Sequence, residues 1–77
     1  MSTITVRYFA AIRERMGRAE DRLDATGLQS VADVWQRISA EPMPANTLVA
    51  INREYARPES AVRPGDEIAF FPPVTGG

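Results

Sequence analysis

The chain has 77 residues, of which 44% are hydrophobic and 25% charged, and its formal net charge at pH 7 is −1. This length allows one small domain, with little core to spare for a deep internal pocket. The composition is that of a globular protein and not of a disordered one. The balanced charge excludes the basic surface that nucleic-acid binding requires, so we expect no nucleic-acid partner.

Several residue types that carry out chemistry are missing. Cysteine and histidine are absent, and all nine basic residues are arginine. The sequence therefore excludes zinc sites with thiolate ligands, nucleophilic thiols and nucleophilic lysine amines. It also excludes histidine, the commonest general base near neutral pH. We expect no metal site and no side-chain catalysis. The N-terminus has no charged segment followed by a long apolar run, which predicts a cytoplasmic protein without a signal peptide or membrane span.

The first third of the chain predicts a hairpin that encloses a short helix. Residues 3–9 alternate in hydropathy and are rich in β-branched side chains, which is typical of a strand. From Ala10 to Met16 the spacing changes to that of a helix, and Gly17 follows where helices often end. Residues 20–25 are expected to form the second strand, paired with the first.

The clearest helix is predicted from Ser30 to Ala40. Its apolar residues recur at helical spacing and form a single stripe, made of Val31, Val34, Trp35 and Ile38. Ser30 is the expected N-cap, with Asp33 completing a capping box. The helix has to end before Pro42. Trp35 is expected to belong to the core, because it lies on the apolar stripe.

The second half of the chain predicts three further strands. Leu48 to Asn52 has the pattern of a buried strand, and a turn around Asn52-Arg53-Glu54 leads into a short strand near Tyr55. A tight turn at Pro64-Gly65-Asp66 precedes the last strand, Glu67 to Phe71, and Asp66 and Glu67 are interpreted as residues of that turn. With one amphipathic helix available to cover one face of a sheet, the expected fold class is α+β.

The C-terminal segment Pro72-Pro73-Val74-Thr75-Gly76-Gly77 is the most informative part of the sequence. Proline ends the strand and stiffens the chain that leaves it, so less entropy is lost when the segment is ordered by a partner. The two glycines have no side-chain bulk and can enter a narrow site. This pattern predicts a C-terminus that acts inside the active site of another protein.

The sequence resembles the small, sulfur-carrying subunit of molybdopterin synthase, a ubiquitin-like β-grasp family. The resemblance spans essentially the whole chain. It is carried by Tyr8-Phe9-Ala10 with Arg13-Glu14, by Val49-Ala50-Ile51-Asn52, and most specifically by the run from Gly65 to Gly77.

The resemblance implies a β-grasp domain over residues 1–71 and an extended tail over residues 72–77. Its mixed sheet would place the first and last strands side by side at the centre, with the main helix on one face and the short helix after the first strand. It also implies a carrier that is no enzyme by itself and binds no permanent cofactor. An adenylyltransferase related to ubiquitin-activating enzymes would use ATP to adenylate Gly77. The Gly77 carboxylate would then become a thiocarboxylate. Gly76, which has no side chain, would leave steric room around the tail. The large synthase subunit, expected in a heterotetramer, would receive the sulfur for the pterin precursor.

A docking surface is predicted on the sheet face opposite the main helix. If the first and last strands are neighbours, Phe9 and Phe71 share that face, with Arg7 nearby. The tail residues Pro72, Pro73, Val74 and Thr75 are expected to extend the contact. Arg13 and Glu14 are interpreted as solvated helix charges.

Other functions share the Gly76-Gly77 ending. A related carrier could serve thiamine synthesis, tRNA thiolation or cysteine synthesis. A protein modifier would share the activation step but end in an isopeptide bond to a target lysine. A plain β-grasp interaction module would have an inert tail. The run Phe70-Phe71-Pro72-Pro73-Val74-Thr75 favours the molybdopterin synthase subunit among these.

Overall fold

The structure is a computed structural model that describes residues 2–73. Five strands and two helices follow one another in the predicted order. Their bounds are β1 Thr3–Tyr8, α1 Ala10–Met16, β2 Glu20–Asp24, α2 Val31–Ile38, β3 Leu48–Ile51, β4 Glu54–Ala56 and β5 Glu67–Phe71. Within the described residues, no helix is long and apolar enough to cross a membrane.

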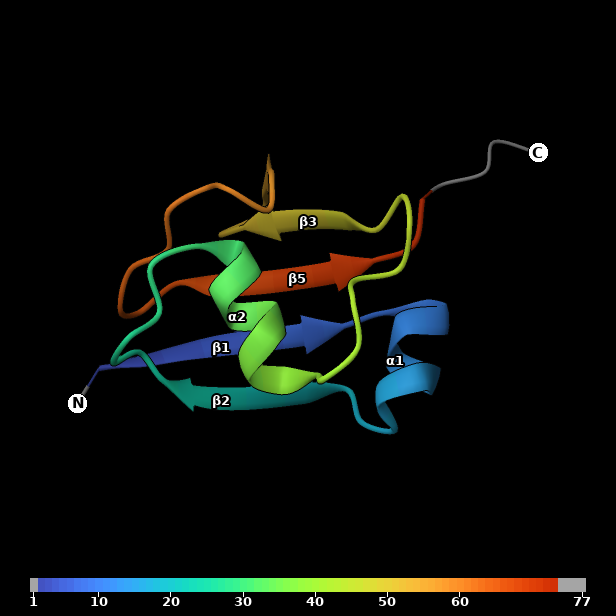
Figure 1. The fold of residues 1–77 in the computed structure, drawn as a ribbon, viewed down its shortest axis with the longest axis horizontal. Coiled ribbons are helices and arrows are strands. Elements are labelled where there is room, and N and C mark those ends of the chain that lie inside the picture. The colour runs from blue at the N-terminus through green and yellow to red at the C-terminus, as the bar shows by residue number, and fades with distance from the viewer. Residues whose placement is uncertain (1, 74–77) are drawn as a thin grey trace.

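The strands form one mixed sheet in the order β2-β1-β5-β3-β4. The first and last strands are parallel neighbours at its centre, and the other pairs are antiparallel. In Figure 1 the dark blue β1 and the red β5 run in the same direction through the middle of the sheet. This confirms the predicted α+β architecture and the central pairing of the first and last strands.

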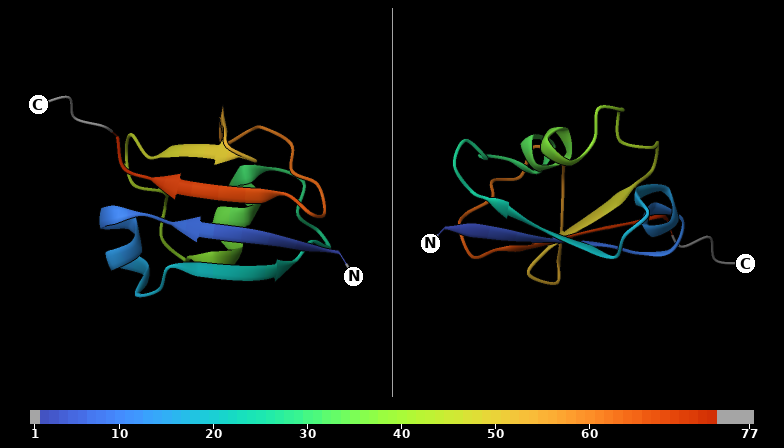
Figure 2. Two further views of the ribbon diagram at one scale, coloured as in Figure 1. Left: turned by 180° about the vertical axis from the view of Figure 1, so that it is seen from behind. Right: turned by 90° about the horizontal axis from the view of Figure 1, so that it is seen from below.

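Figure 2 shows that α2 covers one face of the sheet, and the hydrophobic core lies between the two. From α2, Val31, Val34 and Trp35 are buried, which confirms the predicted stripe and the core position of the tryptophan. The sheet contributes alternate residues of its central strands. These are Ile4, Val6 and Tyr8 of β1, Ile68 and Phe70 of β5, and Val49 of β3.

The helix α2 begins as predicted but ends earlier. The Ser30 hydroxyl accepts a hydrogen bond from the Asp33 amide at 3.2 Å, and the Asp33 carboxylate accepts one from the Ser30 amide at 3.2 Å, so the capping box is complete. The prediction that the helix reaches Ala40 was wrong. Ser39 is extended, its hydroxyl accepts from the Glu41 amide at 3.1 Å, and the Trp35 indole donates to the Glu41 carbonyl at 2.8 Å. These side-chain bonds satisfy the backbone in a turn and replace the last helical turn.

The hairpin of β3 and β4 closes through a two-residue turn, and Asn52 ties this turn to the start of β5. Asn52 and Arg53 both have positive φ, at 50° and 71°, as the favoured hairpin turn requires. The Asn52 side chain donates to the Asp66 carboxylate at 2.9 Å and accepts from the Glu67 amide at 2.9 Å. Asp66 also accepts from the Arg63 amide at 2.8 Å, which confirms it as a turn residue.

Candidate functional site

The structure describes the base of the predicted tail. β5 ends at Phe71 (Figure 1), and Pro72 and Pro73, which follow it, line a groove together with residues of α1. Val74, Thr75, Gly76 and Gly77 lie outside the described residues, so their predicted roles stay predictions. The chain thus leaves the domain from its most central strand pair, next to the N-terminal end of α1.

Three aromatic rings lie together on the outer face of the sheet, the face turned away from α2. The rings of Phe9 and Phe71 meet edge to face with centroids 6.5 Å apart, and Tyr55 lies 6.0 Å from Phe71 on its other side. Phe9 is 46% exposed and Tyr55 is 76% exposed, while Phe71 is half-buried between them. We call Phe9, Tyr55 and Phe71 the aromatic patch. The predicted proximity of Phe9 and Phe71 on this face is confirmed.

The backbone fixes Phe9 at the end of β1. Tyr8 pairs with Phe70 in the parallel register, and the Phe9 amide donates to the Phe70 carbonyl at 3.2 Å. Ala10 then takes a positive φ of 50°, which is uncommon for a residue with a side chain, and turns the chain into α1. The Phe9 carbonyl accepts from the Ile12 and Arg13 amides, so the first turn of the helix holds it from the other side.

Tyr55 is the member of the patch that the sequence analysis did not find. It pairs with Ala50 of β3, and Ala50 pairs with Ala69 of β5. Partners in register point to the same face of a sheet, so Tyr55 shares the face of Ala69 and Phe71. The signal in the sequence was the two-residue turn at Asn52-Arg53, because its length sets the register of the hairpin and places Tyr55 opposite Ala50.

Arg7 lies on the same outer face, beside two acidic residues. Its guanidinium is 3.5 Å from the Glu67 carboxylate and 3.8 Å from that of Glu20, and Glu20 is also 3.9 Å from Arg22. All of these side chains are at least a third exposed, so each pair contributes little to stability. The positive charge of Arg7 is therefore already balanced within this chain. Its predicted part in partner binding stays a prediction.

A buried tyrosine supports the backbone behind Phe9. Tyr8 is 1% exposed, and its hydroxyl donates to the Asp21 carboxylate at 2.8 Å. Arg18 pairs with the same carboxylate and lies over the Tyr8 ring, 5.7 Å from its centroid. Burial, and after it the hydrogen bond to Asp21, raises the pKa of Tyr8 far above its ordinary value. This cluster joins the end of β1 to the start of β2 and so fixes the point where Phe9 emerges.

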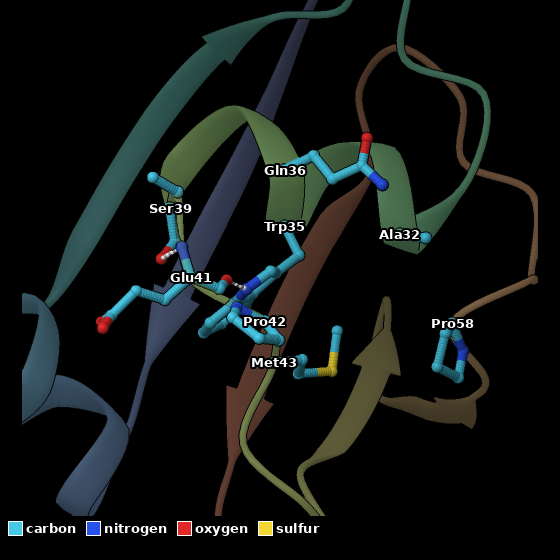
Figure 3. A pocket seen from close by; sticks show the side chains of 9 residues that line it. Ala32, Trp35, Gln36, Ser39, Glu41, Pro42, Met43 and Pro58 are labelled. Atoms are coloured by element: carbon cyan, nitrogen blue, oxygen red, sulfur yellow. Dashed lines mark hydrogen bonds between the residues drawn. The ribbon is translucent and has the colours of Figure 1, made fainter.

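A groove with few polar groups lies on the side of the molecule opposite the aromatic patch. It opens between α2, the segment after it and Pro58, as Figure 3 shows, with the Met43 and Pro58 side chains facing one another. Trp35 forms its floor and is 3% exposed. Most of its wall is apolar. In the part of the chain that the structure describes, no group of three or more acidic residues could hold a metal ion.

Comparisons with known proteins identify the family. The ThiS family matches residues 6–77 of the chain. The molybdopterin synthase sulfur carrier subunit of Haemophilus influenzae is 42% identical, over 96% of this chain and 99% of that protein. The subunit of the same description from Chlamydomonas reinhardtii is 36% identical over 96% and 98%. Among solved structures, SAMP1 of Haloferax volcanii, a small archaeal modifier protein, superposes with a TM-score of 0.79 at 27% identity and covers 97% of this chain and 99% of its own.

Proposed function

The chain belongs to the ThiS family of ubiquitin-like β-grasp proteins, and on that premise we propose that it is the sulfur-carrying subunit of a molybdopterin synthase. The observation that carries this proposal is the 42% identity to the Haemophilus influenzae sulfur carrier subunit, which extends over 96% of this chain and 99% of that protein. A match of this extent leaves no additional domain in the relative to account for its function. The carrier role therefore has to be performed by a domain of this size.

The proposed chemistry takes place at the carboxylate of Gly77. A carboxylate is a poor electrophile, so it first attacks the α-phosphate of ATP in the adenylating enzyme, which releases pyrophosphate and leaves an acyl-adenylate. A sulfur nucleophile then displaces AMP and leaves a thiocarboxylate. The sequence supports this site because it has no cysteine to carry a persulfide and no lysine or histidine to act as a nucleophile or base. The partner enzymes supply the catalytic groups.

We propose that the aromatic patch docks this domain on the large synthase subunit. The tail beyond Pro73 has four residues and spans at most about 14 Å when fully extended, so the receiving active site has to lie close to the tail's base. Exposed aromatic rings beside that base provide the large contact area typical of interface hot spots. Phe71 connects the two parts of the site, because it packs in the patch and directly precedes Pro72.

A second candidate function is conjugation to other proteins. It is favoured by the similarity to the small archaeal modifier protein of Haloferax volcanii, whose fold matches with a TM-score of 0.79. A modifier and a sulfur carrier both begin with adenylation of the terminal glycine. They differ in the second nucleophile, which is a lysine amine for the modifier and a sulfur donor for the carrier.

The experiment that tests the proposal is intact-mass analysis after activation. The full chain is incubated with ATP, its adenylating enzyme and a sulfur source, and a variant lacking Gly77 is the matched control. We expect the wild type to gain the mass difference between sulfur and oxygen and the variant to stay unchanged. Deletion of Gly77 should leave thermal stability unaltered, because terminal residues contribute few contacts.

The product of the reaction separates the two functions. Thiocarboxylated protein that passes its sulfur to a pterin precursor on the large subunit supports the proposal. An adenylated wild type that exchanges no oxygen for sulfur, but becomes linked to lysine side chains of other proteins, would refute it and support the modifier function.

A further inference from the structure

A second apolar surface lies at the base of the tail, on the side away from the aromatic patch. It is a groove of about 290 Å³ between α1, the segment that leads into β3, and the two prolines after β5. Its walls are mostly apolar and include Ala11, Ile12, Pro44, Ala45 and Pro73, with Arg15 at the rim. We call the groove that these residues line together with Pro72 the tail-base groove.

The groove and the patch flank the same point of the chain. On β5 and its continuation, Phe71 belongs to the patch and the next residue, Pro72, lines the groove. On the segment after β1, Phe9 belongs to the patch, whereas Ala11 lines the groove. A protein that surrounds the tail where it leaves the domain therefore meets an apolar surface on both sides.

The walls of the groove are held in place before any partner binds. Ile12 is 3% exposed and packs in the core. On the opposite wall, the Thr47 hydroxyl and amide both donate to the Pro44 carbonyl, at 2.6 Å and 3.2 Å, and fix the turn that carries Ala45. Little ordering is then required on binding, which lowers the entropic cost of a contact here.

The rim carries a charge that a partner can use. Arg15 pairs with Glu41 at 3.1 Å, but the two side chains are 45% and 70% exposed. A pair this exposed contributes little, so a carboxylate of a partner could replace Glu41 at low cost. The chemistry of the groove thus favours a non-polar side chain next to an acidic one.

We propose that the tail-base groove receives a non-polar side chain from the large synthase subunit, at the entrance of the cleft that takes the tail. This inference rests on the proposed function. The four residues beyond Pro73 span at most about 14 Å, so a cleft that encloses Gly77 brings its entrance against Pro72 and Pro73. The two prolines line the groove, and the entrance then covers it. The contact is therefore two-sided, with the patch on one side of the tail and the groove on the other.

The test measures binding of the full-length chain to the purified large subunit from the same organism. Ala45→Asp places a charge in the groove at an exposed position, and Ala19→Asp places the same charge at an exposed position outside it. We expect the Kd of Ala45→Asp to rise at least about tenfold and that of Ala19→Asp to stay within about twofold. Thermal unfolding of both variants should match the wild type, since neither alanine is in the core.

A spectroscopic measurement on the wild type keeps the test independent of the variants. In the complex, we expect the methyl resonances of Ile12 and Ala45 to shift and to show contacts to protons of the large subunit. The groove contact is overturned if Ala45→Asp and Ala19→Asp bind with the same Kd while Phe71→Asp binds more weakly than the wild type. The patch would then remain as the docking surface.

The inference is also overturned if Val74 methyl protons contact Ile12 in the free chain, because the tail itself then fills the groove. A wild type that does not bind the large subunit contradicts the proposed function itself.

Discussion

Phe70 and Phe71 are neighbours on β5 and lie on opposite faces of the sheet. Phe70 is fully buried and its ring meets Trp35 of α2 with centroids 5.0 Å apart. Phe71 is half-buried, and its ring contacts Phe9 and Tyr55, which are themselves exposed. The inner face uses its aromatic residue to close the core. The outer face gathers aromatic residues that stay exposed or half-buried.

The difference shows which face is under a structural constraint. A domain of this size buries a smaller fraction of its surface on folding than a large domain does, so each core residue matters for stability. Exposed aromatic rings add little to that core, and a cluster of them beside a chain end is typical of an interaction surface. Stability and partner binding can therefore be separated by substitutions on the two faces.

The largest expected effect is the difference in stability between variants of Phe70 and variants of Phe71. Phe70→Ala should lower the free energy of unfolding by about 3–5 kcal/mol, because a cavity is left beside Trp35. Phe71→Ala should lower it by about 1 kcal/mol, since the ring is half-exposed and has fewer contacts to lose. Urea denaturation of both variants measures the two values. Equal losses would break the comparison and show that the patch belongs to the core.

The next effect concerns binding. A residue of the exposed outer face should matter for binding and contribute little to stability. Tyr55→Ala should weaken binding to the large synthase subunit by about 2 kcal/mol if the ring is an interface hot spot. Its free energy of unfolding should change by less than about 0.5 kcal/mol, because Tyr55 is 76% exposed. Calorimetric titration gives the affinity, with Arg53→Ala as the control on the adjacent exposed turn. Equal affinities of the two variants would remove Tyr55 from the docking surface.

A third prediction concerns the support behind the patch. Tyr8→Phe removes the hydroxyl that donates to Asp21 and should cost about 1.5 kcal/mol at neutral pH. The pKa of Tyr8 is raised in the folded protein, so the unfolded chain loses this proton first as the pH rises. The stability due to the raised pKa is complete below the ordinary tyrosine pKa of about 10 and decreases above it.

The Tyr8→Phe variant should therefore show a shallower loss of stability between about pH 9 and pH 11, near the ordinary tyrosine pKa. The chain suits this measurement because it has no lysine to titrate in the same range. Urea denaturation of both proteins across this range gives the two slopes. Parallel slopes would mean that the Tyr8 hydroxyl titrates alike in the folded and unfolded states.

Much of the fold could be predicted from local patterns. The stripe of α2, its capping box at Ser30 and the alternation in β1 and β5 each follow from periodicity or from one side-chain contact. The end of α2 could not be predicted, because it depends on the Trp35 indole reaching the Glu41 carbonyl. The central position of β1 and β5 came from the family resemblance, since strand order between distant segments leaves no local signal.

The candidate site was predictable only in part. Phe9 and Phe71 could be placed on one face once their strands were taken as neighbours. Tyr55 and the tail-base groove required the register of the β3–β4 hairpin and the packing of α1 against the segment around Ala45. Such contacts join residues far apart in the sequence and depend on tertiary packing, which propensity and periodicity do not describe.

The smallest predicted effect tests whether the inner layer can be weakened without changing the outer face. Ser30→Ala removes the N-cap of α2 and should cost about 1 kcal/mol, whereas Ser30→Asn keeps an acceptor and should cost less. The cap lies at the start of α2, on the helical layer, and the patch lies on the opposite face of the sheet. Affinity for the large subunit should therefore stay at the wild-type value in both variants when it is measured well below their melting temperatures. A loss of affinity in Ser30→Ala alone would show that α2 controls the position of the docking face, and the two faces would then act as one unit.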